Sequence, residues 1–295
     1  MKRNRIIRGI EGHLFLMWVS LSKLIVFDRL WLRVYYRLAM HEKLSFNNPR
    51  NYTQKIQVLK LRNTNPLYTQ LVDKYGVREY IKEHIGENYL IPLHGVYKHF
   101  DDIDFNALPD CFVLKTTHDS GSVVICHDKN TFDYLNAKKK LESSLKRNYY
   151  WKSRETPYKN VIPQIIVEQY MSDKSSDDLP DYKFYCFDGE PIYLSITSGR
   201  HASKTYCDFF DMDFNHLEIR SFFDNNPITP LKPENFEEMK NVVRKLSIGI
   251  KHVRVDLYNI NGSIYFGEFT FHDSGGLRVF EPEKWNRIWG EHIIL

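Results

Sequence analysis

The sequence feature that most restricts the fold is a hairpin signal near the C-terminus. Residues 252–260 and 263–271 alternate apolar and polar side chains, and the pair Asn261-Gly262 separates them. An Asn-Gly pair between alternating segments is among the strongest short-range signals for a β-hairpin. Three shorter segments of the same strand character precede the hairpin: 181–187, 191–197 and 205–210. The second half of the chain is therefore predicted to form an antiparallel sheet.

Helix and strand signals are mixed in the rest of the chain. Apolar side chains recur at helical spacing in four longer stretches: 1–40, 67–86, 130–149 and 233–251. A short helix is also expected over 53–62, and strands are expected over 89–96, 112–117, 123–126 and 161–171. The chain has 295 residues, of which 42% are apolar and 26% charged, so a folded α+β protein with a sizeable core is predicted.

The mild positive charge of the chain is concentrated at its N-terminus. The whole sequence has a net charge of +4, whereas residues 1–40 hold eight Lys or Arg residues against two acidic ones. The rest of the chain is therefore slightly acidic, which argues against a nucleic-acid-binding body. None of the four cysteines belongs to a C-x-x-C pair, so free thiols in a reducing cytoplasm are expected rather than a zinc site.

The most apolar run, residues 14–27, lies within this basic N-terminal segment. It is short for a membrane span, Lys23 interrupts it, and no cleavage site of a secretory signal follows it. Apolar residues recur every three or four positions here: Ile7, Ile10, Leu14, Met17, Leu21 and Leu24. Such a stripe fits a helix packed on the protein. It also fits an interfacial helix whose apolar face enters the inner face of a membrane beside anionic headgroups, and the sequence leaves both interpretations open.

A lysine in a predicted strand is the first candidate for chemistry. Lys115 lies in the segment 112–117, and a Gly/Ser loop over 118–122 leads into the next strand. An ammonium group beside flexible backbone N–H groups is an arrangement that binds phosphate. No G-K-[ST] sequence and no helix follow, so this is not a Walker loop. A β-hairpin with a solvent-exposed lysine is the plainer explanation of the same pattern.

Acidic side chains in the C-terminal hairpin are the second candidate. Asp256 lies near the end of one predicted strand, and Glu268 and Thr270 lie two apart on its partner, so these two share a face. Facing carboxylates repel unless a cation lies between them, and oxygen ligands of this kind suit Mg²⁺. Charged side chains on a solvated sheet surface are the alternative explanation for this pair.

The order of these parts along the chain resembles that of ATP-grasp enzymes. The segments DKYGVREY, FVLKTTHDSGSVV, VEQYM, HVRVDL and GEFTFHDSGG are similar to the pattern of D-alanine–D-alanine ligases. Together with QKIQVLKL and DYKFYCFDGEP, they resemble the TupA-like ATP-grasp branch over about residues 42–285. The resemblance implies an ATP-grasp fold, in which two α/β subdomains grip ATP between antiparallel sheets. An N-terminal helical segment would precede them, with boundaries at residues 1–66, 67–166 and 167–295.

The resemblance also assigns roles to individual residues. Lys74 and Lys115 would contact the phosphates of ATP, Glu168 would accept from the adenine amino group, and Asp181 would bind the ribose. The implied nucleotide-binding residues are Lys74, Lys115, His118, Ser120, Gly121, Ser122, Glu168, Gln169, Tyr170, Met171 and Asp181. The implied Mg²⁺ ligands are Asp256, Glu268 and Thr270, where Thr270 replaces the usual Asn and puts a second Mg²⁺ in doubt.

Further residues are expected to act on the substrate. Arg254, two residues before the metal aspartate, is implied to stabilise the tetrahedral oxyanion, with Lys115 as the other catalytic residue. The Gly-rich loop of Ser274, Gly275 and Gly276 is implied to bind substrate. Between two predicted strands, Arg200, His201 and Lys204 are candidates for an anionic sugar or the transferred phosphate of ATP, and Lys204 is expected among the ATP-binding residues. An exposed polar turn explains Arg200 and His201 equally well.

The function implied by the resemblance is that of an ATP-dependent carboxylate–amine ligase. It would use ATP and Mg²⁺ to join an amino acid or amine to a glycuronic acid, through an acyl phosphate, in bacterial capsule or surface-polysaccharide biosynthesis in the cytoplasm. One alternative is a glycosyltransferase, because Asp211-Met212-Asp213 forms a D-x-D motif. The other is an ATP-grasp-type sugar kinase that uses the same nucleotide-binding residues. The sequence leaves the oligomeric state open.

Overall fold

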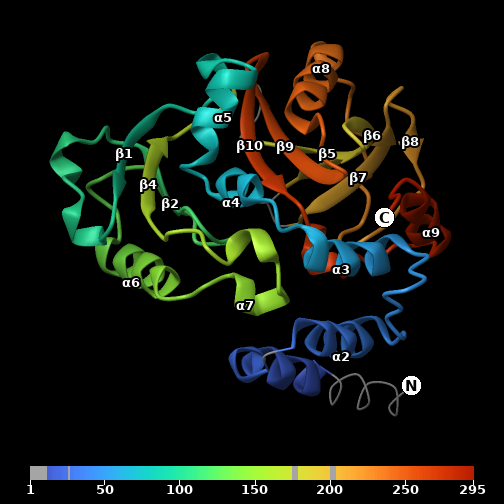
Figure 1. Ribbon diagram of the computed structural model, residues 1–295. Coiled ribbons are helices and arrows are strands. Elements are labelled where there is room, and N and C mark those ends of the chain that lie inside the picture. The colour runs from blue at the N-terminus through green and yellow to red at the C-terminus, as the bar shows by residue number, and fades with distance from the viewer. Residues whose placement is uncertain (1–11, 26, 175–178, 200–203) are drawn as a thin grey trace.

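Two antiparallel sheets form the body of the protein (Figure 1). The computed structural model describes residues 12–25, 27–174, 179–199 and 204–295. The smaller sheet runs in the order β1 (Leu93–Tyr97), β4 (Ile165–Gln169), β2 (Phe112–Thr116) and β3 (Val124–Cys126). All of its pairings are antiparallel, and it contains the strands predicted over 89–96, 112–117, 123–126 and 161–171.

The larger sheet contains the predicted C-terminal hairpin at one edge. Its order is β10 (Ser263–Thr270), β9 (His252–Ile260), β5 (Asp181–Phe187), β6 (Glu190–Ser198), β7 (Tyr206–Asp211) and β8 (His216–Leu217). Asn261 and Gly262 have φ values of 51° and 79° and form the tight turn that their sequence predicts. Asp188 and Gly189, with φ values of 47° and 86°, do the same between β5 and β6. The predicted antiparallel sheet is therefore confirmed.

Helices surround the two sheets and form a further layer at the N-terminal end. They are the helix over 12–20, α2 (Asp28–Met40), α3 (Tyr52–Arg62), α4 (Pro66–Val72), α5 (Val77–His84), α6 (Tyr134–Leu145), α7 (Tyr150–Ser153), α8 (Phe236–Ser247) and α9 (Lys284–Glu291). Among the short 3-10 turns, η5 (Thr156–Tyr158) and η6 (Asp273–Gly276) lie close to the site described below.

One face of the larger sheet is divided between a core and a cavity. Alternate side chains of β5 point to opposite faces, so Phe184 packs with α8 while Tyr185 packs with α3 and α9. Asp181 and Lys183 share the face of Tyr185, but they lie further along the strand and line a cavity. The same strand therefore supplies core residues at one end and charged cavity residues at the other.

A β-bulge in β10 turns Glu268 toward the cavity. In an unbroken strand, Glu268 would share the core face with Phe266, because alternate residues point the same way. The pairing with β9 shifts between Phe266 and Glu268, so Phe266 and Phe269 both pack in the core. Glycine relieves crowding there, because a Cβ on residue 267 would lie in tight contact, 3.0 Å from the backbone oxygen of Asp256.

The continuous helix predicted over 67–86 is wrong, because residues 73–76 interrupt it. Asp73 leaves the helical conformation with ψ at 115°, and its carboxylate accepts a backbone N–H two residues further on (3.0 Å). The backbone N–H of Lys74 donates instead to the carbonyl oxygen of Thr117 (3.0 Å). This break ties Lys74 to the loop that follows β2.

Helices α4 and α5 pack on the larger sheet rather than on the smaller one. Their apolar residues share a core with β5, β9 and β10. Strand β4 spans residue 166, so it crosses the expected boundary between 67–166 and 167–295. The division of the chain into independent units at these boundaries stays a prediction.

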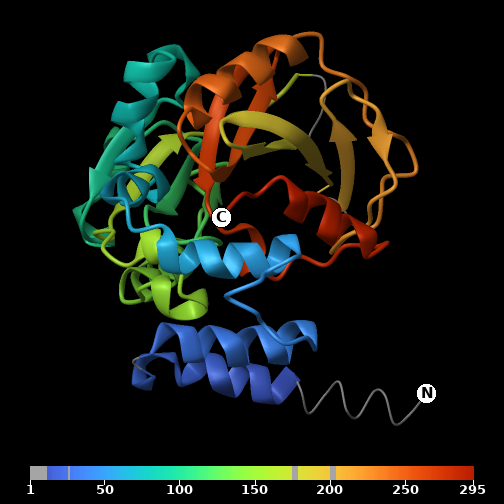
Figure 2. The same cartoon turned by 45° about the vertical axis from the view of Figure 1, so that its right-hand side comes forward.

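The helix over 12–20 and α2 form a layer beneath the body (Figure 2). Trp31, Leu32, Tyr35 and Tyr36 of α2 are buried there. In the part of the chain that the structure describes, no helix is both long and apolar enough to cross a bilayer.

Candidate active site

A cavity of about 580 Å³ lies between the two sheets. Its walls come from β2 and β4 of the smaller sheet and from β5, β9 and β10 of the larger one. Leu90, Ile91 and Ile260 give part of the lining an apolar character, while charged side chains line another part. A cavity with this mixed lining suits a small organic ligand that has both an apolar ring and charged groups.

Glu168 is held between two cations on the wall formed by the smaller sheet. Strand pairing places Glu168 opposite Val113, so Glu168 emerges on the same face as Lys115, two residues further along β2. Lys115 Nζ lies 2.7 Å from one carboxylate oxygen of Glu168, and Arg78 Nη1 lies 3.4 Å from the other. Arg78 also donates to the backbone oxygen of Ile91 (2.9 Å), which fixes it at the end of the cavity.

A buried carboxylate organises the loop after β2. Asp119 accepts hydrogen bonds from three hydroxyl groups, those of Thr116, Ser122 and Ser144. Burial alone would raise the pKa of Asp119, but these hydroxyl groups and nearby Lys74 lower it. The Lys74 ammonium group donates to the backbone oxygen of Asp119. The hydrogen bonds of Asp119 therefore fix the conformation of this loop, and Ser120 and Gly121 face the cavity.

Arg254 binds the two carboxylates of the C-terminal hairpin. Its Nε and Nη2 lie 2.6 and 2.8 Å from Asp256, and Nη2 also donates to Glu268 (2.9 Å). Asp256 and Glu268 are direct partners across β9 and β10, so the hairpin brings them together as its pattern predicts. Lys183 lies 2.8 Å from Asp256. Burial alone would raise the pKa of Asp256, but Arg254 and Lys183 lower it.

Asp273 fixes the Arg254 guanidinium from another side. Arg254 Nη1 and Arg278 Nε each lie 2.5 Å from a different oxygen of the Asp273 carboxylate. Burial alone would raise the pKa of Asp273, but Arg278 and Arg254 hold it well below its usual range. Arg278 also donates to the hydroxyl group of Tyr185 (2.8 Å). With charge-assisted bonds from several sides, the orientation of Arg254 is set before any ligand binds.

The predicted substrate loop follows β10 and is anchored by α3. Ser274, Gly275 and Gly276 have φ values of 55°, 61° and 70°. Gln57 donates to the backbone oxygens of Gly275 (3.1 Å) and Gly276 (2.9 Å), and Lys60 donates to that of Gly275 (2.7 Å). A Cβ on Gly276 would collide with the side chain of Gln57, so this close approach requires glycine.

Most of the predicted nucleotide and metal residues line this one cavity. They are Lys74, Lys115, Ser120, Gly121, Glu168, Gln169, Tyr170, Met171, Asp181, Asp256 and Glu268. Two others are turned elsewhere. His118 is buried with its Nε2 3.0 Å from the backbone oxygen of Arg147, and Ser122 faces Asp119. Thr270 is not among the lining residues, but its hydroxyl group donates to Glu268 (3.3 Å), which lines the cavity.

Of the three candidate residues between β6 and β7, the structure describes Lys204. Lys204 is half exposed and forms an ion pair with Asp224 (2.8 Å), away from the residues that line the cavity. The structure therefore does not bring Lys204 to the other predicted nucleotide-binding residues. Arg200 and His201 lie outside the described residues.

The D-x-D motif closes a turn. The Asp211 carboxylate accepts hydrogen bonds from the backbone N–H groups of Asp213 (3.0 Å) and Asn215 (2.8 Å) and from the Asn215 side chain (2.9 Å). Neither aspartate is among the residues that line the cavity. A local structural role explains this motif, and the geometry gives no support to the glycosyltransferase alternative.

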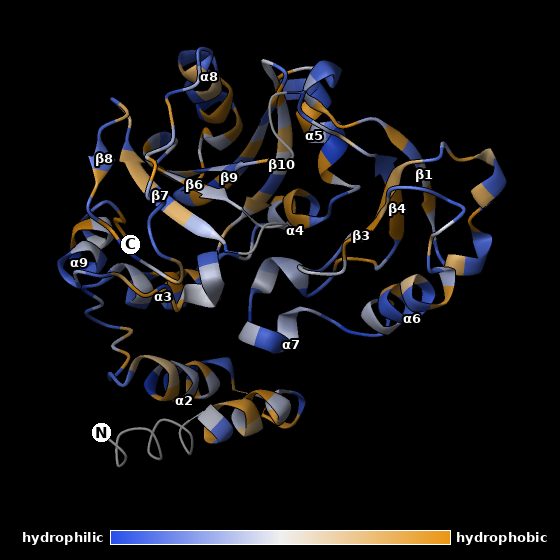
Figure 3. Cartoon of the chain, turned by 180° about the vertical axis from the view of Figure 1, so that it is seen from behind, coloured by the Kyte–Doolittle hydropathy of each residue, from blue (hydrophilic) through white to orange (hydrophobic). Residues whose placement is uncertain are grey.

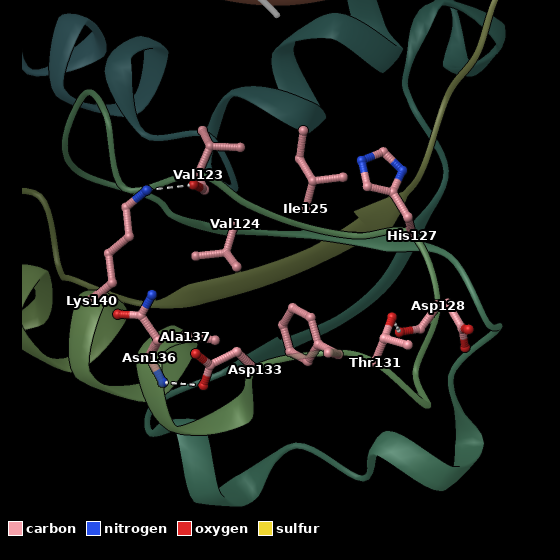
Figure 4. A pocket seen from close by; sticks show the side chains of 11 residues that line it. Val123, Val124, Ile125, His127, Asp128, Thr131, Asp133, Asn136, Ala137 and Lys140 are labelled. Carbon is pink, nitrogen blue, oxygen red and sulfur yellow. Dashed lines mark hydrogen bonds between the residues drawn. The ribbon is translucent and has the colours of Figure 1, made fainter.

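A second hollow of about 420 Å³ lies on the far side of β3, against the start of α6 (Figure 4). Its charged groups are engaged locally. Asp133 caps α6 by accepting the backbone N–H of Asn136 (2.9 Å), and Lys140 donates to the backbone oxygen of Val123 (2.7 Å). Because Asp133 and Lys140 already have partners, this hollow is a weaker candidate for chemistry than the cavity between the sheets.

The paired carboxylates fit a magnesium ion that takes further ligands from a phosphate. Across the described ranges, no group of three or more His, Cys, Asp or Glu side chains is arranged to hold a metal ion. Mg²⁺ usually takes only one or two carboxylates and completes its shell with water and substrate phosphate oxygens. Asp256 and Glu268 provide such a pair.

Sequence reasoning missed four charged residues of the site: Arg78, Lys183, Asp273 and Arg278. Two of them carried a usable signal. Arg78 lies four residues after Lys74, which would be one turn in the helix predicted over 67–86, and Lys183 lies two residues after Asp181 and so on the same face of its strand. The contacts of Asp273 with Arg254 and Arg278 depend on a loop conformation that has no periodic pattern.

Comparison with known proteins gives one extensive match. The model of the family described as TupA-like ATPgrasp matches residues 54–294. A search of curated proteins finds no match. The match over most of the chain confirms the resemblance and the predicted ATP-grasp fold, and it agrees with the predicted class of enzyme, an ATP-dependent ligase.

Three of the matching solved structures are distant likenesses. D-alanine–D-alanine ligase from Bacillus anthracis, complexed with ATP, is 18% identical with a TM-score of 0.38, covering 68% of this chain and 54% of that one. The enzyme of the same name from Helicobacter pylori is 13% identical with a TM-score of 0.41, covering 81% and 62%. A RimK-domain ATP-grasp protein from Sphaerobacter thermophilus is 10% identical with a TM-score of 0.42, covering 77% and 69%. The chain thus spans less than two thirds of the length of the two ligases, and the assignment to a family rests on the family model alone.

Proposed function

Because this chain belongs to the TupA-like ATP-grasp family, we propose that it is an ATP-dependent ligase that joins an amine to a carboxylate. The observation that carries the proposal is the cavity between the sheets. Lysines line it on one side, and the Asp256–Glu268 pair lines it on the other. This arrangement suits a nucleotide whose triphosphate bridges the two sides.

In this proposal, the smaller sheet binds the nucleotide. The apolar lining around Ile91 receives the adenine ring, and Glu168 accepts a hydrogen bond from its amino group. The backbone of Gln169–Met171 faces the ring edge, and Asp181 binds the ribose. Lys115 and Lys74 bind phosphate oxygens, with Ser120 and Gly121 over them. Because Lys115 is paired with Glu168 before the nucleotide arrives, binding would exchange one ionic contact for another.

The larger sheet binds Mg²⁺ and the reacting groups. Asp256 and Glu268 would hold the metal, which when bound neutralises charge on the transferred phosphoryl group. The substrate carboxylate attacks the γ-phosphorus, and ADP leaves as the acyl phosphate forms. The amine then attacks the acyl carbon, loses a proton and expels phosphate, which leaves the amide. Arg254 is aimed by Asp273 and stabilises the negative oxygen of the tetrahedral intermediate. Most of the rate enhancement then comes from positioning and electrostatics.

The substrate class follows from the family rather than from the geometry. We propose a glycuronic acid or a polysaccharide intermediate as the carboxylate and an amino acid or amine as the acceptor, in bacterial capsule or surface-polysaccharide biosynthesis. The loop of Ser274–Gly276 would contact this substrate. Because the reaction uses ATP, the proposed location is the cytoplasm, with peripheral contact to the inner face of the membrane through the N-terminal segment.

Product analysis tests the proposal. The protein is incubated with Mg-ATP, uronic acids, amino acids and UDP-sugars, and the products are identified by mass spectrometry. ADP, phosphate and an amide are expected. A phosphorylated sugar without an amide would indicate the kinase instead, and release of UDP without consumption of ATP would exclude both ATP-dependent activities.

Two substitutions that keep side-chain size test the site. Lys115→Met and Glu268→Gln should each lower ATP turnover by about 100-fold or more, because the first removes a positive charge at the phosphates and the second removes a carboxylate proposed to hold Mg²⁺. Lys138→Met is the matched control, since Lys138 is an exposed lysine paired with Asp101. Turnover by either site variant that equals that of the control would overturn the assignment of the site.

A further inference from the structure

The helix over residues 12–20 packs on the protein through one set of apolar side chains. Phe15, Trp18 and Val19 join the cluster that surrounds Trp31 and Tyr35 of α2. The Trp18 indole donates to the backbone oxygen of Trp31 (3.2 Å), and the rings of Phe15 and Tyr35 lie 5.3 Å apart. This set is enough to fix the helix on α2.

A second set of apolar side chains faces away from the protein. Met17 and Leu21 are exposed, Leu24 is 76% exposed, and Phe27 is 74% exposed where the chain enters α2. The described part of the stripe found in the sequence, from Leu14 onward, is therefore exposed, whereas Ile7 and Ile10 lie outside the described residues. Phe15, Trp18 and Val19 pack inward from an adjoining side of the helix. Figure 3 shows hydrophobic residues along this helix at the edge of the molecule. A helix that is apolar on two sides normally has a partner on both.

The N-terminal layer that carries this outer stripe also carries exposed cations. Lys23 and the α2 residues Arg29, Arg33 and Arg37 are all exposed. Asp28, the acidic residue of α2, is engaged by Arg154, whose Nη1 lies 2.5 Å from its carboxylate. The layer thus combines exposed apolar side chains with cations that no other carboxylate on α2 offsets.

We propose that the described residues 14–25 and 27–37 form a docking surface for an anionic lipid bilayer. The apolar stripe enters the boundary between headgroups and acyl chains, and the flanking lysine and arginines contact anionic headgroups. The charge selects this partner. A second copy of the chain would bring two positively charged surfaces together, and an uncharged apolar partner would leave the cations without counter-charges. The inference does not depend on the reaction proposed above.

Arg154 holds this docking surface rigidly against the body. Besides binding Asp28, it donates to the backbone oxygens of Ser22 and Ile25 and stacks over the ring of Trp151, with 4.6 Å between the guanidinium carbon and the ring centroid. These contacts span the turn between the two helices and the α7 segment. Membrane docking would therefore orient the whole enzyme, not a loosely tethered tail.

Vesicle flotation of the full chain tests this surface. Vesicles of phosphatidylcholine alone are compared with vesicles that also contain phosphatidylglycerol. The wild type should float with the anionic vesicles and bind neutral ones weakly. Replacing Met17, Leu21 and Leu24 together by serine should weaken binding by roughly 100-fold or more. Replacing Arg33 and Arg37 together by glutamine should weaken it by about five-fold for each charge removed.

Leu135 and Leu231 provide the matched control, because both are highly exposed leucines outside the docking surface. Their double serine variant should bind as the wild type does. Unchanged near-ultraviolet circular dichroism confirms that each variant is folded. Absence of vesicle binding by the wild type, equal affinity for neutral and anionic vesicles, or unchanged binding by the serine triple variant would each overturn the proposal. So would dimerisation through this face without vesicle binding.

Discussion

Replacing Asp273 by asparagine should strongly destabilise the protein, because two buried guanidinium groups would lose their shared carboxylate. Asp273 is fully buried, and the side chains of Arg254 and Arg278 are only 11% and 7% exposed. Removing one partner of a buried ion pair typically costs about 3–5 kcal/mol. With a urea dependence of about 3 kcal/mol per molar, the unfolding midpoint at pH 7 should fall by roughly 1–1.7 M.

The pH dependence of this loss identifies its cause. The pKa of Asp273 is held well below its usual range in the folded protein, so its stabilising effect is complete above the unfolded value of about 3.9. The effect is lost as the pH falls through the folded value, because the unfolded state binds the proton first. The difference in unfolding free energy between wild type and Asp273→Asn should therefore be constant above about pH 5 and narrow below about pH 4.

Asp101→Asn is the control for this experiment. Asp101 also pairs with a lysine, but its side chain is 68% exposed, and exposed pairs contribute about 0–1 kcal/mol. Urea titrations of wild type and both variants at several pH values provide the measurement. If Asp273→Asn moved the midpoint no further than Asp101→Asn at pH 7, or if its effect did not change at low pH, the inferred role of Asp273 would be refuted.

Two further predictions concern buried cations that do not line the cavity. Burial lowers the pKa of Lys60 to about 7, whereas an unfolded lysine has a pKa near 10.4, so the unfolded state binds more protons between these values. The unfolding free energy of the wild type should therefore rise from about pH 7 to about pH 9.5 relative to that of Lys60→Met. Urea titrations that gave the same difference between the two proteins at every pH would contradict this. Arg154→Met removes the contacts that hold the N-terminal layer, so limited trypsin digestion of residues 12–40 should accelerate at least about tenfold. The exposed Arg244→Met variant should not show this acceleration. If trypsin digested Arg154→Met no faster than the wild type, the inferred role of Arg154 in holding the N-terminal layer would be refuted.

The fold could be predicted where its signals were local. Asn261-Gly262 and Asp188-Gly189 each form the turn that their side chains and backbone preferences favour, so the strands on either side of these turns could be predicted. The prediction of one helix over 67–86 failed at residues 73–76. The apolar spacing continues across this break, but the Asp73 carboxylate accepts a backbone N–H group and so competes with the helical hydrogen bonds. A periodic pattern shows which residues face the same way, but it does not detect a single competing hydrogen bond.

The apolar stripe near the N-terminus also shows what helical spacing can and cannot predict. Its helical spacing was evident, and the structure contains a helix over the part that it describes. The spacing did not reveal that Phe15, Trp18 and Val19 form a second apolar face, nor that this second face is the one that packs. Which of two apolar faces is buried depends on the neighbouring helix, which becomes known only in three dimensions.

Candidate site residues could be found where a charged side chain interrupts an apolar strand. Lys115, Asp256 and Glu268 all stand out in this way. The orientation of Glu268 required more than alternation, because strict alternation would have placed it on the core face with Phe266. The bulge at Gly267 corrects this, and a glycine within a strand was the one signal of it in the sequence.

The charges of the cavity also bear on how a metal would enter it. Four cationic and four acidic side chains line it: Lys74, Arg78, Lys115 and Lys183 against Glu168, Asp181, Asp256 and Glu268. Arg254 adds a fifth cation in contact with the Asp256–Glu268 pair, so bare Mg²⁺ would enter a site that is already neutralised. The described residues also offer no third acidic ligand in reach of that pair. A triphosphate brings its own negative charge and oxygen ligands. The protein should therefore bind Mg²⁺ weakly alone and strongly as Mg-ATP, with the nucleotide completing the metal site.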